Sequence, residues 1–285
     1  MRTLPCPSRD RVRDHLITAL EVYESNGVRR GYEVTPAELD SIVTLYDAYD
    51  CLYGAPDVRL RGPGLDEALR TAVHDGYEFT QLGRKLAAIR AELMRGVELC
   101  PICGISAPRE LDHHLPRSAF HPLAIYVRNL VPLCHDCNHS KGPGEAAEPE
   151  MRFIHPYFDD LPDVLFLRAA VSIDNGGLLV EYDIDPAAAL PELTRSRLSY
   201  QLRRLKLNER YAREINAYLT SHTIAIRCSY DSGGADTVRS FLNMQAAVEE
   251  IVFHRNHWRP VLLRALASHQ AFCDGGFTVV LPLAA

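Results

Sequence analysis

Two pairs of closely spaced cysteines constrain this chain more than any other feature of its sequence. Cys100 and Cys103 form one Cys-x2-Cys pair, and Cys134 and Cys137 form the second. Four thiolates of this kind can hold one tetrahedral zinc ion, and a site with four protein ligands is closed and leaves no position for chemistry. We therefore predict a structural zinc site that fixes this part of the fold.

The interval between the two pairs is long enough to hold a second structural unit. Zinc ribbons place roughly 15–20 residues between their pairs, whereas residues 104–133 separate the pairs here. The pattern predicts a strand over residues 109–113, a polar loop over 116–122, a second strand over 126–133 and a helix that begins near His135.

The polar residues of this interval resemble the ββα-metal module of HNH endonucleases. The resemblance is carried by three phrases of the sequence: Leu-Asp-His-His-Leu-Pro-Arg-Ser, Asn-Leu-Val-Pro-Leu-Cys and Cys-Asn-His-Ser-Lys-Gly. Matched position by position, it implies that Asp112 and Asn138 bind one divalent cation. It also implies that His113 is the general base and that Asn129 braces the loop that orients this base. Lys141 would lie near the phosphates of the substrate.

The implied ligands favour a hard catalytic cation beside the structural zinc. One carboxylate and one amide oxygen suit Mg²⁺ or Mn²⁺, which prefer oxygen ligands. Many relatives place a histidine where Asn138 stands, and this chain has His139 immediately after it. The cation would polarise the phosphodiester and stabilise the leaving oxygen, while a neutral imidazole removes a proton from the attacking water.

Two assignments in this interval have alternatives. His114 follows His113, and a shift of one residue in a strand moves every side chain to the opposite face. We assign the base to His113 because it directly follows the acidic ligand. Arg117, Arg128 and Lys141 are candidate substrate contacts, although each is equally compatible with an ordinary surface charge. The nearby histidines are interpreted as packing residues: His121, His135, His139 and His155.

Composition limits the remaining function classes. The chain has 285 residues and a formal net charge of −6, which argues against broad electrostatic attraction to nucleic acid. Residues 84–141 are mildly basic, which allows a local contact face. No apolar signal core and no stretch long enough to cross a bilayer are visible, so we expect a cytoplasmic protein without membrane contact. Four other cysteines are expected to be ordinary thiols: Cys6, Cys51, Cys228 and Cys273.

The flanking regions predict an α+β protein that is mainly helical. We divide it into a helical region over residues 1–95, a central zinc-held nuclease module over 96–160, and a mixed hairpin and helical region over 161–285. Helices are expected at 10–24, 36–53, 65–74, 80–95, 186–222, 236–255 and 258–269. A hairpin is expected from 164–173 and 178–184, turned at 174–177, and a strand over 277–282.

Together these observations predict a metal-dependent endonuclease that hydrolyses DNA phosphodiester bonds, and we favour a role as an effector of bacterial anti-phage defence. DNA is the expected partner, and a protein partner or a second copy of the chain is left open. The alternative is a non-catalytic zinc knuckle that binds nucleic acid or protein. It would be favoured if Asp112 and Asn138 could not converge on one ion.

Overall fold

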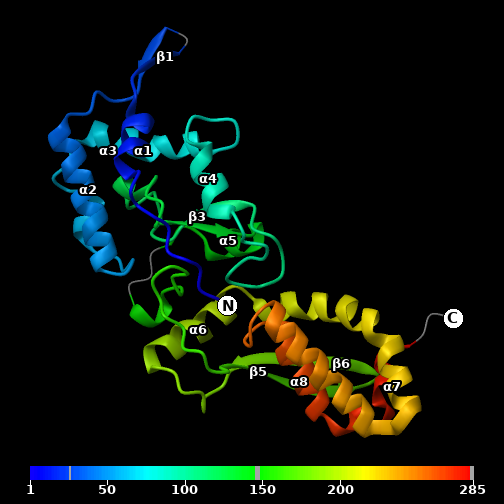
Figure 1. Cartoon of the computed structure of the whole chain (residues 1–285). Coiled ribbons are helices and arrows are strands. Elements are labelled where there is room, and N and C mark those ends of the chain that lie inside the picture. The colour runs from blue at the N-terminus through cyan, green and yellow to red at the C-terminus, as the bar shows by residue number, and fades with distance from the viewer. Residues whose placement is uncertain (26, 145–147, 283–285) are drawn as a thin grey trace.

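A computed structural model describes residues 1–25, 27–144 and 148–282 of the chain. Within these residues the fold is α+β and mainly helical, as the sequence predicted, and its strands form three separate two-stranded antiparallel sheets. Figure 1 shows helices α1 to α4 at one end, strand β3 and helix α5 in the middle, and helices α6 to α8 with strands β5 and β6 at the other end.

The N-terminal region consists of four helices and one small hairpin. The helices are α1 (Val12–Leu20), α2 (Pro36–Cys51), α3 (Glu67–Gly76) and α4 (Ala87–Met94), and β1 (Tyr23–Ser25) pairs with β2 (Val28–Arg30). The capping box predicted at the start of α2 is confirmed. Thr35 Oγ1 accepts the backbone N–H of Glu38 at 3.3 Å, and the Glu38 carboxylate accepts that of Thr35 at 2.8 Å.

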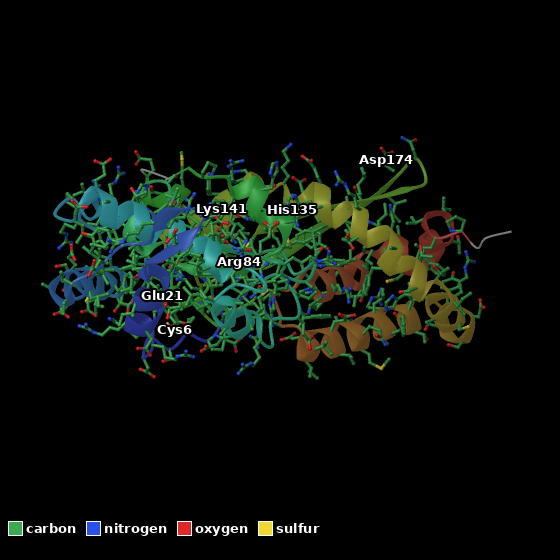
Figure 2. The ribbon with its side chains drawn as sticks, turned by 90° about the horizontal axis from the view of Figure 1, so that it is seen from above. Cys6, Glu21, Arg84, His135, Lys141 and Asp174 are labelled. Carbon is green, nitrogen blue, oxygen red and sulfur yellow. The ribbon has the colours of Figure 1, made fainter. Side chains whose placement is uncertain are left out.

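The central region has the predicted order of strand, loop, strand and helix. Strand β3 (Glu110–His113) pairs with β4 (Leu130–Leu133), and α5 (His135–Lys141) follows directly. In Figure 2, His135 and Lys141 of α5 lie between the N-terminal helices and the C-terminal helices, whereas Asp174 marks the projecting end of the C-terminal hairpin.

The C-terminal region contains a longer hairpin and an antiparallel helical pair. Strand β5 (Leu167–Asp174) pairs with β6 (Gly177–Ile184) across a turn at Asn175 and Gly176, as predicted. Helix α6 (Glu192–Arg204) leads into α7 (Leu207–Val252), which is broken at Gly233 and Gly234. The Tyr218 hydroxyl donates to Glu249 at 2.9 Å, so the two arms of α7 fold back on each other. Helix α8 (Trp258–Ser268) and the short α9 (Phe277–Val280) complete the region.

Several expected element boundaries are wrong. The helix expected over 10–24 ends at Leu20, and a hairpin follows; Asn26, expected at its end, lies outside the described residues. The helix expected over 80–95 begins only at Ala87, and the strand expected over 126–133 begins at Leu130. The strand expected over 277–282 is helical over 277–280, because Phe277 can pack on Phe272 and Tyr230 without a partner strand.

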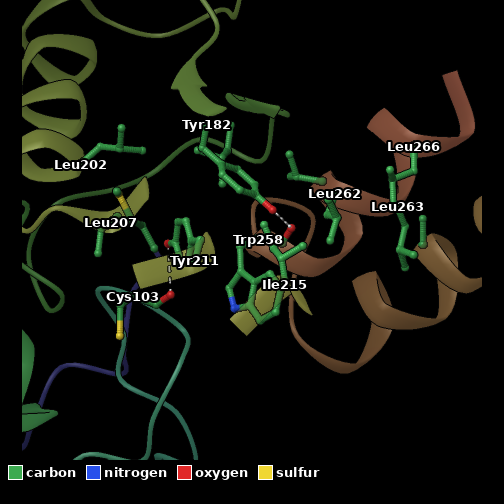
Figure 3. Packing of buried hydrophobic residues seen from close by; sticks show 14 of the residues in the cluster. Cys103, Tyr182, Leu202, Leu207, Tyr211, Ile215, Trp258, Leu262, Leu263 and Leu266 are labelled. Carbon is green, nitrogen blue, oxygen red and sulfur yellow. Dashed lines mark hydrogen bonds between the residues drawn. The ribbon is translucent and has the colours of Figure 1, made fainter. Parts of the chain in front are cut away.

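Two hydrophobic cores meet at the central region. The N-terminal core joins α1 to α4 with the loop between β3 and β4, and in it the rings of Tyr46 and Tyr126 stack at 4.0 Å. The C-terminal core joins α6 to α8 and the hairpin with the four cysteines, around Tyr211 and Trp258 (Figure 3). Among the described residues no helix has both the length and the apolar character that crossing a membrane requires.

Candidate metal centre and adjoining polar cluster

The four predicted zinc ligands converge. The ligand atoms of Cys100, Cys103, Cys134 and Cys137 all lie within 4.8 Å of one another, and all four side chains are buried; we call this set the cysteine cluster. Cys100 and Cys103 come from the turn before β3, and the other two come from the start of α5. Four buried thiols at this spacing fit one tetrahedral metal ion, and thiolate ligands fit zinc.

A cation from the C-terminal region faces the cysteine cluster. The Arg210 guanidinium donates to the sulfurs of Cys137 at 3.2 Å and of Cys103 and Cys134 at 3.5 Å each. Burial alone would lower the pKa of Arg210, but the neighbouring sulfurs raise it above its ordinary value. Arg210 therefore stays charged and offsets part of the negative charge that four thiolates carry. It lies 73 residues beyond Cys137 in the sequence, which gave no sign of this contact.

The backbone of the first cysteine turn is fixed to the C-terminal core. The Tyr211 hydroxyl donates to the carbonyl of Cys103 at 3.1 Å (Figure 3), and the Trp258 indole donates to the carbonyl of Gly104 at 3.3 Å. Gly104 has a φ of 65°, and a Cβ there would lie 2.7 Å from the His257 ring. A side chain at position 104 would thus separate the turn from α8.

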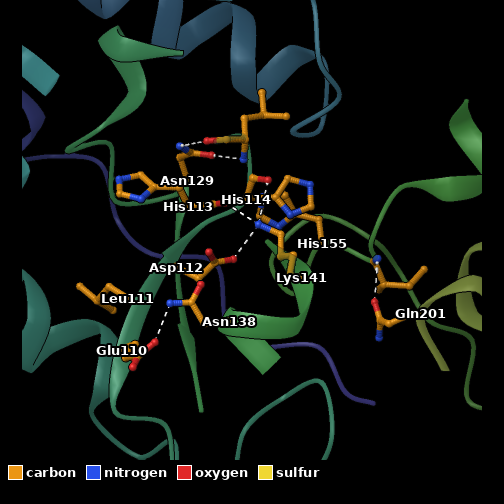
Figure 4. Close-up of polar contacts among 12 residues, drawn as sticks. Glu110, Leu111, Asp112, His113, His114, Asn129, Asn138, Lys141, His155 and Gln201 are labelled. Atoms are coloured by element: carbon orange, nitrogen blue, oxygen red, sulfur yellow. Dashed lines mark hydrogen bonds and ion pairs between the residues drawn. The ribbon is translucent and has the colours of Figure 1, made fainter. Parts of the chain in front are cut away.

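The other predicted residues form a polar cluster beside the cysteine cluster, which we define as Asp112, His113, Asn129, Asn138 and Lys141. Asn138 is oriented by Glu110, whose carboxylate accepts from its Nδ2 at 2.6 Å and also contacts His135 Nδ1 at 2.7 Å. The amide oxygen of Asn138 is thereby turned toward Asp112 (Figure 4). The two implied oxygen ligands of the catalytic cation point toward each other.

Lys141, at the end of α5, pairs with the Asp112 carboxylate. Its ammonium donates to Asp112 Oδ2 at 2.7 Å and to the carbonyls of His113 at 2.6 Å and His114 at 3.3 Å. Burial raises the pKa of Asp112, and the charge of Lys141 opposes that shift. All three protons of the ammonium thus have acceptors within the protein. A contact between Lys141 and a phosphate, which stays a prediction, requires the lysine to leave at least one of them.

His113 is held through one ring nitrogen. Its Nε2 lies 2.8 Å from the carbonyl of Ala124, so the proton of the neutral ring sits on Nε2 and the lone pair on Nδ1. Burial lowers the pKa of His113 to about 3, which keeps the ring neutral at ordinary pH. The ring packs against Tyr77 at a centroid distance of 4.5 Å, on the side of β3 away from Asp112 (Figure 4).

His114 lies on the same side of β3 as Asp112. It lines one small space together with Asp112 and Lys141, and its ring lies 4.0 Å from that of His155. Burial holds the pKa of His114 well below its ordinary value. The two adjacent histidines, either of which could be the base, therefore differ in structure. The ring of His113 is anchored by a hydrogen bond, whereas His114 lies nearer to Asp112.

Asn129 ties both ends of the loop between β3 and β4. Its Oδ1 accepts the backbone N–H of Leu115 at 2.8 Å, and its Nδ2 donates to the carbonyls of Leu115 at 3.1 Å and Leu123 at 3.2 Å. Leu123 precedes Ala124, whose carbonyl holds His113. The fully buried amide thus positions the loop that orients the candidate base, in the way the resemblance implies.

Two residues that the sequence did not single out extend this network. His155 Nδ1 accepts the N–H of Tyr157 at 3.1 Å, so its Nε2 donates to the Tyr49 hydroxyl at 2.9 Å. That hydroxyl donates in turn to Asn129 Oδ1 at 3.1 Å. Helix α2 and the segment after α5 therefore both fix Asn129. In the sequence His155 was interpreted as a packing residue.

The two arginines predicted as substrate contacts have partners within the protein. Arg128 pairs with Asp50 at 2.6 Å and donates to the carbonyl of Pro7 at 2.9 Å, which connects β4 with the N-terminal helices. Arg117 pairs with Glu78 at 3.1 Å, and its side chain is 34% exposed. Arg117 is the more accessible of the two, and contact of either with a substrate stays a prediction.

Comparisons with known proteins give a distant relative. No family model matches the chain, and no solved structure matches it. The sequence is similar to a phage protein. Protein ea31 of Escherichia phage lambda is 25% identical over 198 residues, which cover 64% of this chain and 66% of that protein, just under two thirds of its length.

Proposed function

We propose that this chain is an HNH endonuclease that hydrolyses DNA phosphodiester bonds with Mg²⁺ or Mn²⁺ beside a structural zinc. The observation that carries the proposal is the orientation of Asn138. Because the amide nitrogen of Asn138 donates to the Glu110 carboxylate at 2.6 Å, the amide oxygen faces the Asp112 carboxylate. A zinc module that only binds nucleic acid or protein does not require a buried carboxylate and an amide oxygen that face each other.

The residues would divide the chemistry as follows. Asp112 and Asn138 supply oxygen ligands that fit a hard cation, which when bound would polarise the phosphodiester and stabilise the leaving oxygen. His113 holds its proton on Nε2 against Ala124, so Nδ1 is the nitrogen that would take a proton from the attacking water. Asn129 keeps the loop that orients His113 in place.

Lys141 is the part of the arrangement that must move. Its ammonium neutralises Asp112 at 2.7 Å, and a cation bound to the same carboxylate would repel it. The released ammonium would then lie beside the bound phosphodiester, which is the role that the resemblance implies for it.

One observation favours the non-catalytic alternative. Asp112 is only 8% exposed and is already paired with Lys141, as a purely structural ion pair would be. A zinc module of that kind would bind nucleic acid or protein through its surface and would cut nothing.

The deciding experiment is cleavage of supercoiled plasmid by the purified protein in Mg²⁺ or Mn²⁺, with EDTA as the control. The Asp112→Ala variant, assayed in parallel with its zinc content measured, excludes a contaminating nuclease. We expect metal-dependent cleavage by the parent protein, little by the variant at low metal concentration, and partial recovery at high concentration. Equal cleavage by both proteins, or none by either, would contradict the proposal.

A further inference from the structure

An open cleft of about 540 Å³ lies beside the polar cluster. It is bounded by the turn after α2, the end of α5 and one face of α6. The residues that matter here are Tyr53, His114, Lys141, Arg197, Tyr200 and Arg204. His114 and Lys141 also line the small space that contains Asp112, so the cleft adjoins the candidate metal ligands. Its volume is in the range of roughly 300–1,000 Å³ found for small-ligand sites.

The candidate centre is recessed. The side chain of Asp112 is 11% exposed and that of Lys141 is 10% exposed. Duplex DNA is stiff, with a persistence length of about 50 nm, so a phosphate in an intact double helix is less able to reach a recessed carboxylate than one in an unpaired strand. An unpaired strand can do so, because each nucleotide turns independently once it is unstacked.

The cationic groups of the cleft are not equally available. Lys141 is bound to Asp112, and Arg197 is bound to Asp159 at 2.6 Å and 2.7 Å. Arg204 is exposed, and within the part of the chain that the structure describes it has no carboxylate partner; its Nη2 donates to the Lys141 carbonyl at 3.4 Å. Arg204 can therefore meet a phosphate without breaking an ion pair, although Glu148 also lines the cleft and opposes its charge.

Aromatic rings line the same cleft. Tyr53 is 71% exposed, and its φ of 51° places it in the left-handed region, where a residue other than glycine is uncommon. Tyr200 lies deeper and contacts Phe153 edge to face at 5.6 Å. Aromatic rings combined with an available cation along a groove are the features by which proteins bind single strands, since a base stacks on a ring whatever its sequence.

We propose that this cleft binds an unpaired DNA strand and leads it to Asp112 and Asn138, so that the substrate is single-stranded or flap DNA rather than intact duplex. The inference rests on the proposed nuclease function. Tyr53 stacks a base, and Arg204 contacts a phosphate.

The test measures binding and cleavage separately on the full chain. Fluorescence anisotropy without added Mg²⁺ or Mn²⁺ and without a chelator, so that the structural zinc is kept, compares a labelled single-stranded oligonucleotide with its duplex, and cleavage of both is then followed in Mn²⁺. A base that stacks on an aromatic ring contributes substantially to binding affinity, so Tyr53→Ala should weaken single-strand binding roughly tenfold. Tyr53→Phe keeps the ring and should retain the parent affinity. Arg204→Ala should flatten the salt dependence by about 0.7 of a log unit per log unit of salt. Arg203→Ala, which removes an exposed charge from the same helix outside the cleft, should leave it unchanged.

The outcomes separate the two proposals. Preference for the single strand, lost in Tyr53→Ala and kept in Tyr53→Phe, supports the cleft. If duplex is bound and cut as well as single strand, or if Tyr53→Ala binds like the parent, this inference is wrong and the nuclease function stands. If neither form is bound or cut, the proposed function fails and the cleft proposal with it.

Discussion

The cysteine cluster and the polar cluster share β3, β4 and α5 but are completed in different ways. In the cysteine cluster four identical groups converge from one turn and from the start of α5, and Arg210 contacts three of them. In the polar cluster each side chain has its own partner: Glu110 for Asn138, Ala124 for His113 and Lys141 for Asp112. The first arrangement suits a metal that never leaves. The second fixes the direction of individual atoms, which catalysis requires and structural support does not.

The largest effect is expected from breaking the cysteine cluster. Cys137→Ser removes one zinc ligand, and the binding energy of structural zinc is folding energy. We expect loss of zinc and a fall in Tm of roughly 10 °C or more, since each kcal/mol shifts Tm by roughly 2–4 °C in a chain of this size. Elemental analysis and thermal unfolding measure both. Cys228→Ser, at an exposed cysteine, is the control; parent-like zinc content in Cys137→Ser would show that the cluster is not a metal site.

The next effect tests whether the polar cluster is catalytic. A positioned base contributes roughly 10²- to 10⁴-fold in rate, so His113→Ala should lose most single-turnover cleavage while the chain stays folded and keeps its zinc. His114→Ala is its matched neighbour. If His114→Ala is inactive and His113→Ala cuts at the parent rate, the base is the histidine on the Asp112 side of β3.

A smaller effect is expected from the cation that faces the sulfurs. Groups that contact metal ligands typically contribute 10- to 100-fold in metal affinity, so Arg210→Met should weaken zinc binding by about that factor. Competition with a chromophoric chelator measures it. Arg213→Met removes an exposed charge from the same helix and should retain the parent affinity. Equal affinities for the two variants would leave Arg210 only a packing role.

The smallest effect is expected from Glu110, which orients Asn138. Glu110→Ala releases the amide, and a hydrogen bond to a charged group is worth roughly 1.5–3 kcal/mol, only part of which reaches the metal. The Mg²⁺ concentration for half-maximal cleavage should therefore rise roughly three- to tenfold, without loss of zinc. Glu98→Ala, at an exposed position, is the control. An unchanged Mg²⁺ requirement would mean that Asn138 orients itself without Glu110.

Local sequence was enough to predict the central strands and the convergence of the four cysteines, because these depend on short spacings within one segment. The bracing role of Asn129 came from the resemblance and not from spacing. Local sequence could not identify Arg210, Tyr49 or His155. Their roles follow from packing between regions 73 to 106 residues apart, and no periodicity encodes that. The tail at 277–280 shows the converse error: its β-branched residues favour a strand, but burial of Phe277 decided its conformation.

Two hydrophobic cores meet at the central region, so its stability depends on the regions on both sides of it. Phe120 and Leu123 of the β3–β4 loop belong to the N-terminal core, whereas the cysteines belong to the C-terminal core. A fragment cut near residues 96 and 160 would expose apolar surface on both sides. Unfolding at either end therefore removes support from the centre, so the three regions are expected to melt as one cooperative unit, and limited proteolysis would not release a folded central fragment.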